Sequence, residues 1–232
     1  GYWAWDPVAN ASLLPWLTGT AFLHSVMIQE RRRMLKVWNL SLIILTFALT
    51  LFGTFLTRSG ILSSVHAFAG SPGIGGSFLS FIALALLISF GLLAVRSDRL
   101  KTPAELDSLL SRESAFVLNN VILLAATFSV LFGTIYPLLS EALRGVKASV
   151  GAPFFNLVNF PILLVLLLLM GIGPLIAWRR ASPDNLRRNF LGPGFGALGA
   201  GLLIFLLGYR DPRVMLILVL SAFVVATITL DL

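Results

Sequence analysis

The feature that most constrains this chain is a series of long apolar stretches separated by short basic segments. An α-helix needs roughly 20 apolar residues to cross a hydrocarbon core of about 30 Å. The stretches are close to this length, and they predict seven spanning helices, over residues 12–28, 39–57, 77–95, 115–139, 157–178, 190–209 and 214–230. Of the 232 residues, 57% are hydrophobic and only 12% are charged, against about 25% charged in soluble domains. We therefore expect an all-α membrane protein, a polytopic bundle of about seven transmembrane helices.

The basic residues alternate between the connecting segments. Four lie in each of the first, third and fifth segments, whereas the second, fourth and sixth hold one, two and two. By the positive-inside rule the first, third and fifth segments are cytoplasmic, so residues 1–11 and 58–76 are external. Lipid headgroups thus account for the net charge of +7, and we expect a lipid bilayer as partner and no nucleic acid.

Two further patterns concern the connecting segments. Thr102-Pro103-Ala104-Glu105 has the form of a capping box and predicts a short cytoplasmic interfacial helix near residues 102–113. The turn at residues 210–213 is so short that the last two spans could instead form one re-entrant element.

Glycine and proline predict local features of the later spans. Gly171, Gly173 and Pro174 predict a kink in the fifth span. A stripe of small residues in the sixth span predicts close approach of another helix: Gly192, Gly196 and Ala200.

The N-terminal segment is rich in aromatic residues. Asp6-Pro7 predicts a helix start, with Asp6 as N-cap and proline at the first helical position. Trp3 and Trp5 could belong to an interfacial aromatic belt, or they could form a stacking platform for a flat apolar ligand such as a porphyrin.

Three ionisable residues are candidate ligand contacts. His24 lies inside the first span, where it is either a functional group or a neutral imidazole bonded to a neighbouring helix. Because the chain has no cysteine, a functional His24 suits an axial heme ligand better than a zinc ligand. His66, in an unusually apolar external loop, is a second candidate ligand. Arg58 could pair with a propionate or serve as a snorkelling anchor.

Several stretches of the chain match, in order, a known pattern: Trp3-Ala4-Trp5-Asp6-Pro7-Val8, His24, and residues 55–60, 64–69, 113–114, 119–120, 133–139, 149–156 and 171–175. In these stretches the chain resembles the CcmF family, the heme lyase subunit of bacterial cytochrome c maturation. The resemblance implies a fragment of a longer protein, with residues 1–11 as part of a tryptophan-rich motif. His24 matches a transmembrane heme ligand and His66 an external one, and the partner of each lies outside this sequence. Ala9 stands where the family has glutamate.

The resemblance also implies an activity. A periplasmic heme chaperone of the CcmE type would deliver heme for thioether attachment to the CxxCH segment of an apocytochrome c, with a CcmH-type thioreductase subunit as a further partner. The implied catalytic group is His66, Trp3, Trp5 and Asp6. Heme would contact both tryptophans and Arg58, and iron would be ligated by His24, which holds a separate heme b, and by His66. The implied location is the bacterial inner membrane with a periplasmic active face. The alternative is a non-catalytic multi-pass scaffold or transporter subunit.

Overall fold

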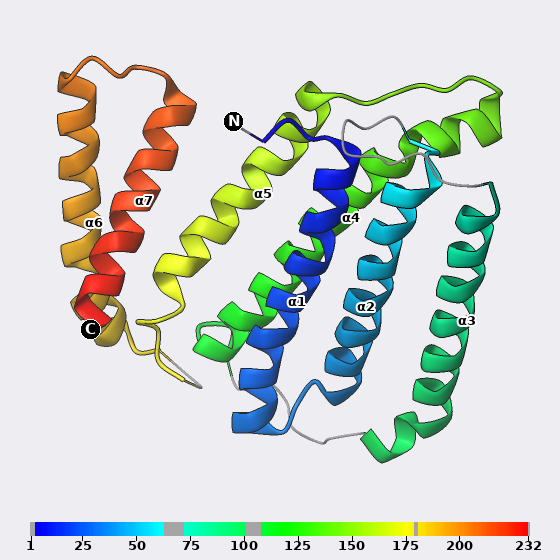
Figure 1. The fold of residues 1–232 in the computed structure, drawn as a ribbon. Coiled ribbons are helices and arrows are strands. Elements are labelled where there is room, and N and C mark those ends of the chain that lie inside the picture. The colour runs from blue at the N-terminus through cyan, green and yellow to red at the C-terminus, as the bar shows by residue number, and fades with distance from the viewer. Residues whose placement is uncertain (1–2, 63–71, 101–107, 179–180, 232) are drawn as a thin grey trace. The chain divides into compact units, whose positions relative to one another are not determined.

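All regular secondary structure is helical in the part of the chain that the structure, a computed structural model, describes: residues 3–62, 72–100, 108–178 and 181–231 (Figure 1). The α-helices are α1 (Pro7–Arg32), α2 (Lys36–Ser59), α3 (Pro72–Arg96), α4 (Arg112–Arg144), α5 (Ala152–Ile172), α6 (Pro183–Leu206) and α7 (Pro212–Asp231). A 3-10 turn, Ser97–Leu100, follows α3. All seven α-helices are long and apolar enough to cross a membrane. The predicted fold class, an all-α polytopic membrane protein, is confirmed.

A capping residue followed by proline starts three helices, α1, α6 and α7, and each begins before its predicted span. The carboxylate of Asp6 accepts hydrogen bonds from the backbone N–H groups of Val8 and Ala9. Ser182 and Asp211 cap α6 and α7 in the same way, and each is followed by proline. Such caps supply partners for N–H groups that have none within the helix. The predicted N-cap at Asp6 is confirmed.

The fifth span differs from its prediction, because α5 ends at Ile172 and does not continue through a kink to residue 178. Pro174 has no N–H to continue the helical ladder, and it disfavours helical geometry in the residue before it. The carbonyls freed at residues 174–177 are satisfied from elsewhere in the chain. Arg112 and Asn189 donate to them. The expected kink is therefore a helix end.

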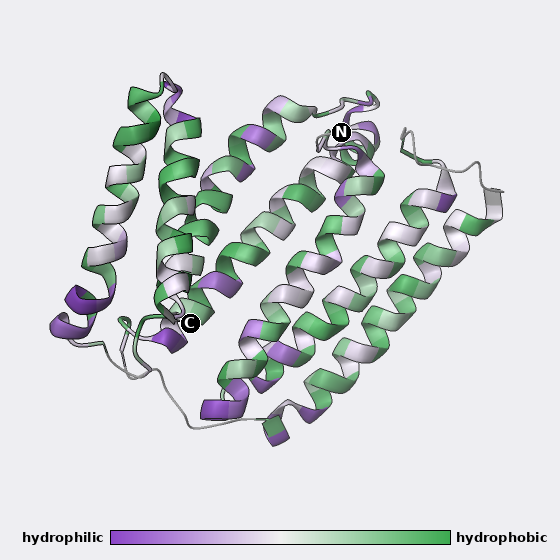
Figure 2. Cartoon of the chain, turned by 60° about the vertical axis from the view of Figure 1, so that its left-hand side comes forward, coloured by the Kyte–Doolittle hydropathy of each residue, from purple (hydrophilic) through white to green (hydrophobic). Residues whose placement is uncertain are grey.

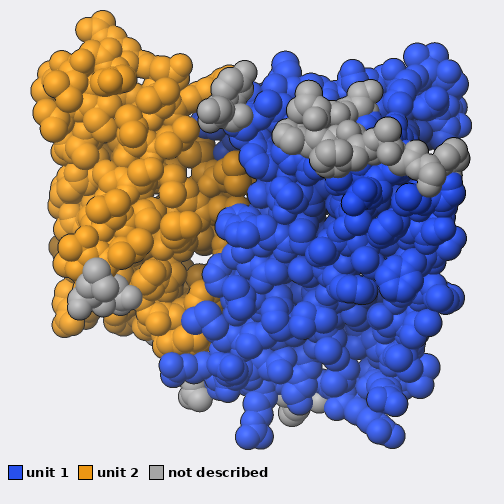
Figure 3. All heavy atoms as spheres, viewed as in Figure 1, with its two compact units in different colours: residues 1–104, 123–160 blue, residues 105–122, 161–232 orange. Residues whose placement is uncertain are grey.

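The chain divides into two compact units (Figure 3). Unit 1 is Gly1–Ala104 with Leu123–Phe160, and unit 2 is Glu105–Ile122 with Pro161–Leu232, so α4 and α5 contribute to both. In unit 1, α1, α2 and α3 lie side by side in chain order (Figure 1). Polar pairs join α1 to α2: Thr46 Oγ1 bonds Thr18 Oγ1 at 2.8 Å, and Asn39 Nδ2 donates to Gln29 Oε1 at 2.7 Å. Small and polar contacts of this kind are typical of helix pairs in membranes, where burial of apolar surface alone gives no preference for a neighbour.

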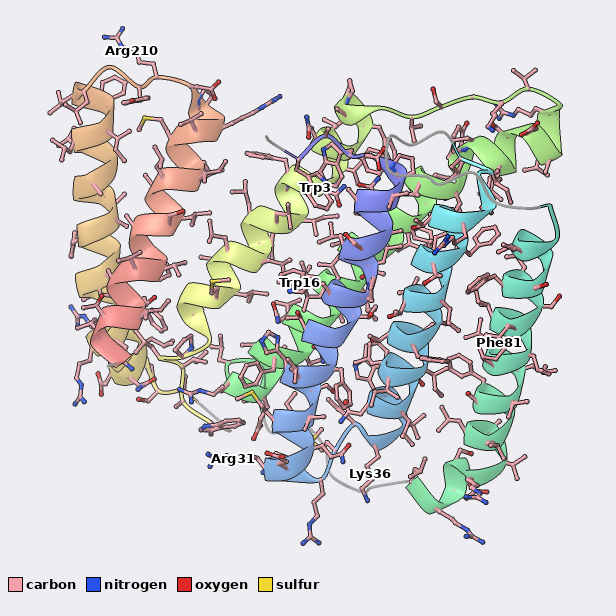
Figure 4. All side chains as sticks on the ribbon, in the orientation of Figure 1. Trp3, Trp16, Arg31, Lys36, Phe81 and Arg210 are labelled. Atoms are coloured by element: carbon pink, nitrogen blue, oxygen red, sulfur yellow. The ribbon has the colours of Figure 1, made fainter. Side chains whose placement is uncertain are left out.

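Charged residues lie toward the helix ends. Figure 2 shows that the central parts of the helices are mostly hydrophobic and that hydrophilic residues are concentrated near the helix ends. In unit 1, Figure 4 shows Trp3 at one end of α1, and Arg31 and Lys36 at the other. This separation agrees with the alternation of basic residues along the sequence.

In unit 2, α6 and α7 form an antiparallel pair of separate helices joined by a short turn. A Cβ added at Gly201 would lie 2.7 Å from the side chain of Val219, so the two backbones approach closely there. The buried small face of α6 is formed by Pro193, Ala197 and Gly201. The predicted stripe is displaced by one residue, because added Cβ atoms at Gly192 and Gly196 would meet nothing described within 4 Å.

The predicted interfacial helix near residues 102–113 falls partly outside the described residues. Of the described remainder, residues 108–111 are not helical, and Arg112 begins α4.

Candidate functional site

Three segments of unit 1 meet at one end of α1, α2 and α4. They are the N-terminal residues 3–6, the end of α2 with residues 60–62, and residues 144–156, which run from the end of α4 into the start of α5. Lys147 Nζ donates to the carbonyl of Ile61 at 3.1 Å, which ties the second and third of these segments together. We call this region the tryptophan end.

Trp5 is held in the tryptophan end by a stacking contact and a hydrogen bond. Its ring stacks on Phe155, with centroids 4.9 Å apart and planes 10° from parallel. Its indole N–H donates to Asn156 Oδ1 at 2.8 Å. The backbone of Trp5 has φ of +57°, a left-handed conformation that bulky residues rarely adopt. Contacts from elsewhere in the chain must therefore hold it in place.

Asn10 supplies one of those contacts. The side chain is only 1% exposed, and its Nδ2 donates to the carbonyl of Trp5 and to Thr134 Oγ1, both at 3.1 Å. Thr134 donates in turn to the carbonyl of Val130 in its own helix. A chain of hydrogen bonds thus runs from the Trp5 backbone through α1 into α4.

Gly133 makes room for the aromatic packing. A Cβ at this position would lie 2.6 Å from the ring of Phe155 and 2.8 Å from the ring of Phe154. Real Cβ contacts are not this short, so no larger residue fits without displacing the rings. The glycine allows Phe155, which is 2% exposed, to pack closely against α4 while its ring stacks on Trp5.

Trp3 and Trp5 have different surroundings. Their rings meet edge to face at 6.1 Å and 86°, a favourable aromatic geometry. Trp5 is half-buried with one face on Phe155, whereas Trp3 is 45% exposed. Trp16 is 63% exposed and lies farther along α1, separate from the pair (Figure 4). Trp3 is thus the aromatic surface of the pair that a ligand can reach most readily.

His24 lies deep in α1, at about 25 Å along the helix axis from Pro7. The imidazole is half-buried, beside the buried residues Ala21, Ser25 and Ile28. Among the described residues no three His, Cys, Asp or Glu side chains form a cluster that could hold a metal ion. One imidazole among apolar helices fits an axial ligand of heme iron, whereas zinc needs three or four protein ligands.

The other predicted site residues are Arg58 and His66. Arg58 is exposed in the last turn of α2, at the tryptophan end. His66 lies outside the described residues. The structure therefore brings Trp3, Trp5, Asp6 and Arg58 to one end of unit 1 and separates them from His24.

Sequence reasoning did not assign site roles to the residues that hold the tryptophans. These are Asn10, Gly133, Thr134, Phe155 and Asn156. A signal was present in the sequence, since all five lie in or beside stretches that resemble the CcmF family.

Comparison with known proteins finds relatives among cytochrome c-type biogenesis proteins. Residues 1–62 match the family described as "Cytochrome C assembly protein". The chain is 47% identical over 203 residues to cytochrome c-type biogenesis protein CycK of Rhizobium meliloti, covering 87% of this chain and 30% of that protein. It is 42% identical over 229 residues to CcmF of Pseudomonas aeruginosa, covering 97% of this chain and 34% of that protein.

A solved structure named "Cytochrome c Heme Lyase CcmF" matches with a TM-score of 0.76 and 38% identity, over 99% of this chain and 33% of that one. The chain thus spans about a third of the length of the relatives it matches. In sequence and in fold, it belongs to the CcmF family of cytochrome c-type biogenesis proteins.

Proposed function

We propose that this chain is part of a heme lyase that positions heme for covalent attachment to an apocytochrome c. The observation that carries the proposal is the tryptophan end itself. An exposed aromatic ring, Trp3, is supported there by a rigidly held Trp5, at the end of α1 remote from the basic Arg31 and Lys36. A flat, apolar porphyrin is the kind of ligand that such a surface stacks against.

The reaction needs orientation more than reactive groups from this chain. A cysteine thiol of the apocytochrome CxxCH segment adds across a heme vinyl group. The sulfur–carbon bond forms, the S–H bond breaks, and the proton goes to the other vinyl carbon, with no net transfer of electrons. Holding the two partners in reacting geometry is then the main contribution of the protein.

Each predicted residue has a role in this proposal. Trp3 stacks on the heme plane, and Trp5 supports Trp3. Asp6 starts α1 and so sets the direction of the motif. His66 would hold the iron of the substrate heme, and Arg58 would pair with a propionate.

A second heme, of the b type, is proposed at His24. The half-buried imidazole of His24 would hold the iron of this group. When bound, such a group would supply one-electron redox chemistry, of the kind needed to keep heme iron ferrous. The distance along α1 keeps this site apart from the tryptophan end.

The proposed setting is the bacterial inner membrane, with the tryptophan end on the periplasmic face. Basic residues at the opposite end of unit 1 support this orientation. The proposed partners are a CcmE-type heme chaperone, which delivers heme, and a CcmH-type subunit, which presents the apocytochrome.

An absorption spectrum of the detergent-purified full-length protein tests the proposal. We expect a Soret band with b-type α and β bands that His24→Ala removes while the protein still inserts. Met27→Ala, at an exposed position on the same helix, is the matched control and should keep the bands. Trp3→Ala should lower the yield of matured cytochrome c and leave these bands intact. A colourless wild-type protein would contradict the proposal and favour a scaffold or transporter subunit, and full heme retention by inserted His24→Ala would contradict the heme b site.

A further inference from the structure

We propose that Asn10 and Thr134 are positioning residues, which tie the carbonyl of Trp5 to helix α4 and thereby set where Trp3 presents its ring. The inference rests on the proposed function, since it concerns how heme is received at the tryptophan end. Neither side chain needs to touch the heme.

The backbone of Trp5 gives the first argument. A tryptophan with φ of +57° is strained and would relax toward an extended conformation if nothing held it. Relaxation would swing the preceding residues, and Trp3, two positions earlier, would move with them. The place of Trp3 therefore depends on whatever holds the Trp5 peptide.

The hydrogen bonds of Asn10 give the second argument. The two protons of its amide go to the Trp5 carbonyl and to Thr134 Oγ1. Thr134 is 3% exposed and its own proton goes to Val130, so its oxygen is available as a fixed acceptor. Because both protons of Nδ2 are bonded, the Asn10 amide is held in one orientation and links the Trp5 carbonyl to α4.

The third argument is that burying the Asn10 side chain lowers the stability of the fold. Its Oδ1 is buried and has no hydrogen-bond partner among the described residues. An unsatisfied buried acceptor lowers stability, and an apolar residue of similar size would avoid the cost. An apolar residue could not make the two hydrogen bonds that Nδ2 donates, and one of these bonds holds the tryptophan motif.

The α4 side of the contact permits a sharp test in the full-length protein. Thr134→Val keeps the shape of the side chain and removes the acceptor, whereas Thr134→Ser keeps the hydroxyl. Thr127→Val is the matched control, because Thr127 is buried in the same helix and its hydroxyl donates to Leu123 of that helix. Asn10→Leu removes both donations at once.

The first measurement needs no heme. Oxidative footprinting with mass spectrometry compares the modification rates of Trp3 and Trp5 in the heme-free protein. We expect Trp3 to react faster than Trp5 in the wild type, in Thr134→Ser and in Thr127→Val, and we expect the difference to narrow in Thr134→Val and Asn10→Leu. An unchanged rate ratio in both of the latter variants would overturn the inference.

The second measurement is titration with hemin, read at the Soret band. Loss of one hydrogen bond should weaken hemin binding about fivefold in Thr134→Val, with recovery in Thr134→Ser and no change in Thr127→Val. Equal hemin affinity in Thr134→Val and the wild type would overturn the positioning role. A third outcome is that Trp3→Ala binds hemin as tightly as the wild type while Thr134→Val still changes the oxidation rates of Trp3 and Trp5. In that case the proposed function fails and the hydrogen-bonded connection stands.

Discussion

The indole N–H of Trp5 donates a 2.8 Å hydrogen bond to Oδ1 of Asn156, which lies 151 positions farther along the chain. The neighbouring Phe155 stacks on the same indole ring. The start of α5 therefore holds the tryptophan motif from one side while Asn10 holds it from the other. The geometry of Trp3 and Trp5 is a property of three distant segments acting together.

Gly133 should be intolerant of even one added methyl group. Gly133→Ala would place a Cβ 2.6 Å from the Phe155 ring, and overpacking of this kind costs about 1–3 kcal/mol of unfolding free energy. Thermal unfolding in detergent measures the loss. Gly91→Ala is the control, because a Cβ there meets nothing described within 4 Å and alanine favours the helix. Equal midpoints for the two variants would contradict the close packing of Phe155 on α4.

Lysine should not be able to replace Arg112, a residue of unit 2, without a loss of stability. Its guanidinium donates to the carbonyls of Pro174 and Ile176 and lies 5.4 Å from the centre of the Trp178 ring. Lysine cannot reproduce this forked and stacked arrangement, so we expect Arg112→Lys to lower the unfolding free energy by about 1–3 kcal/mol. Arg187→Lys, at an exposed position, should change it by less than about 0.5 kcal/mol. Similar unfolding midpoints for both would mean that the end of α5 does not depend on Arg112.

The orientation of unit 1 can be tested by thiol labelling, because the chain has no cysteine. Val146 is 66% exposed at the tryptophan end, and Glu30 is exposed near the opposite end of α1. Met34 is less suitable as a probe because it is only 8% exposed. In intact cells an impermeant reagent should label Val146→Cys and spare Glu30→Cys, and permeabilised cells should give labelling of both. The reverse pattern in intact cells would invert the proposed topology.

Restoring an acid at position 9 should stabilise the start of α1. The first turn of this helix has no acidic residue, and a carboxylate there interacts favourably with the helix dipole, by about 0.3–1 kcal/mol. Ala9→Glu should therefore raise the unfolding midpoint above that of Ala9→Gln, which has a similar shape and no charge. Cytochrome c yield, measured on the same variants, shows whether the acid also affects heme handling. A midpoint no higher for glutamate than for glutamine would rule out the electrostatic contribution.

The sequence alone was sufficient for the number and order of the helices and for the residues that start α1. Apolar length and capping pairs such as Asp6-Pro7 are local properties of the chain, so seven helices and the start of α1 follow from residues close in sequence. The resemblance also drew attention to Trp3, Trp5 and His24 without any knowledge of their contacts.

Only the tertiary structure decided how those residues are held. Local pattern predicted that the fifth span continues to residue 178, whereas α5 ends at Ile172 and Arg112, more than 60 positions away, bonds the freed carbonyls. Asn10 likewise meets Thr134 across 124 positions. Hydropathy specifies which residues enter the membrane, but the hydrocarbon is equally apolar on every side of a helix. The choice of neighbour therefore depends on small residues and polar pairs, whose partners become apparent only when the helices are packed.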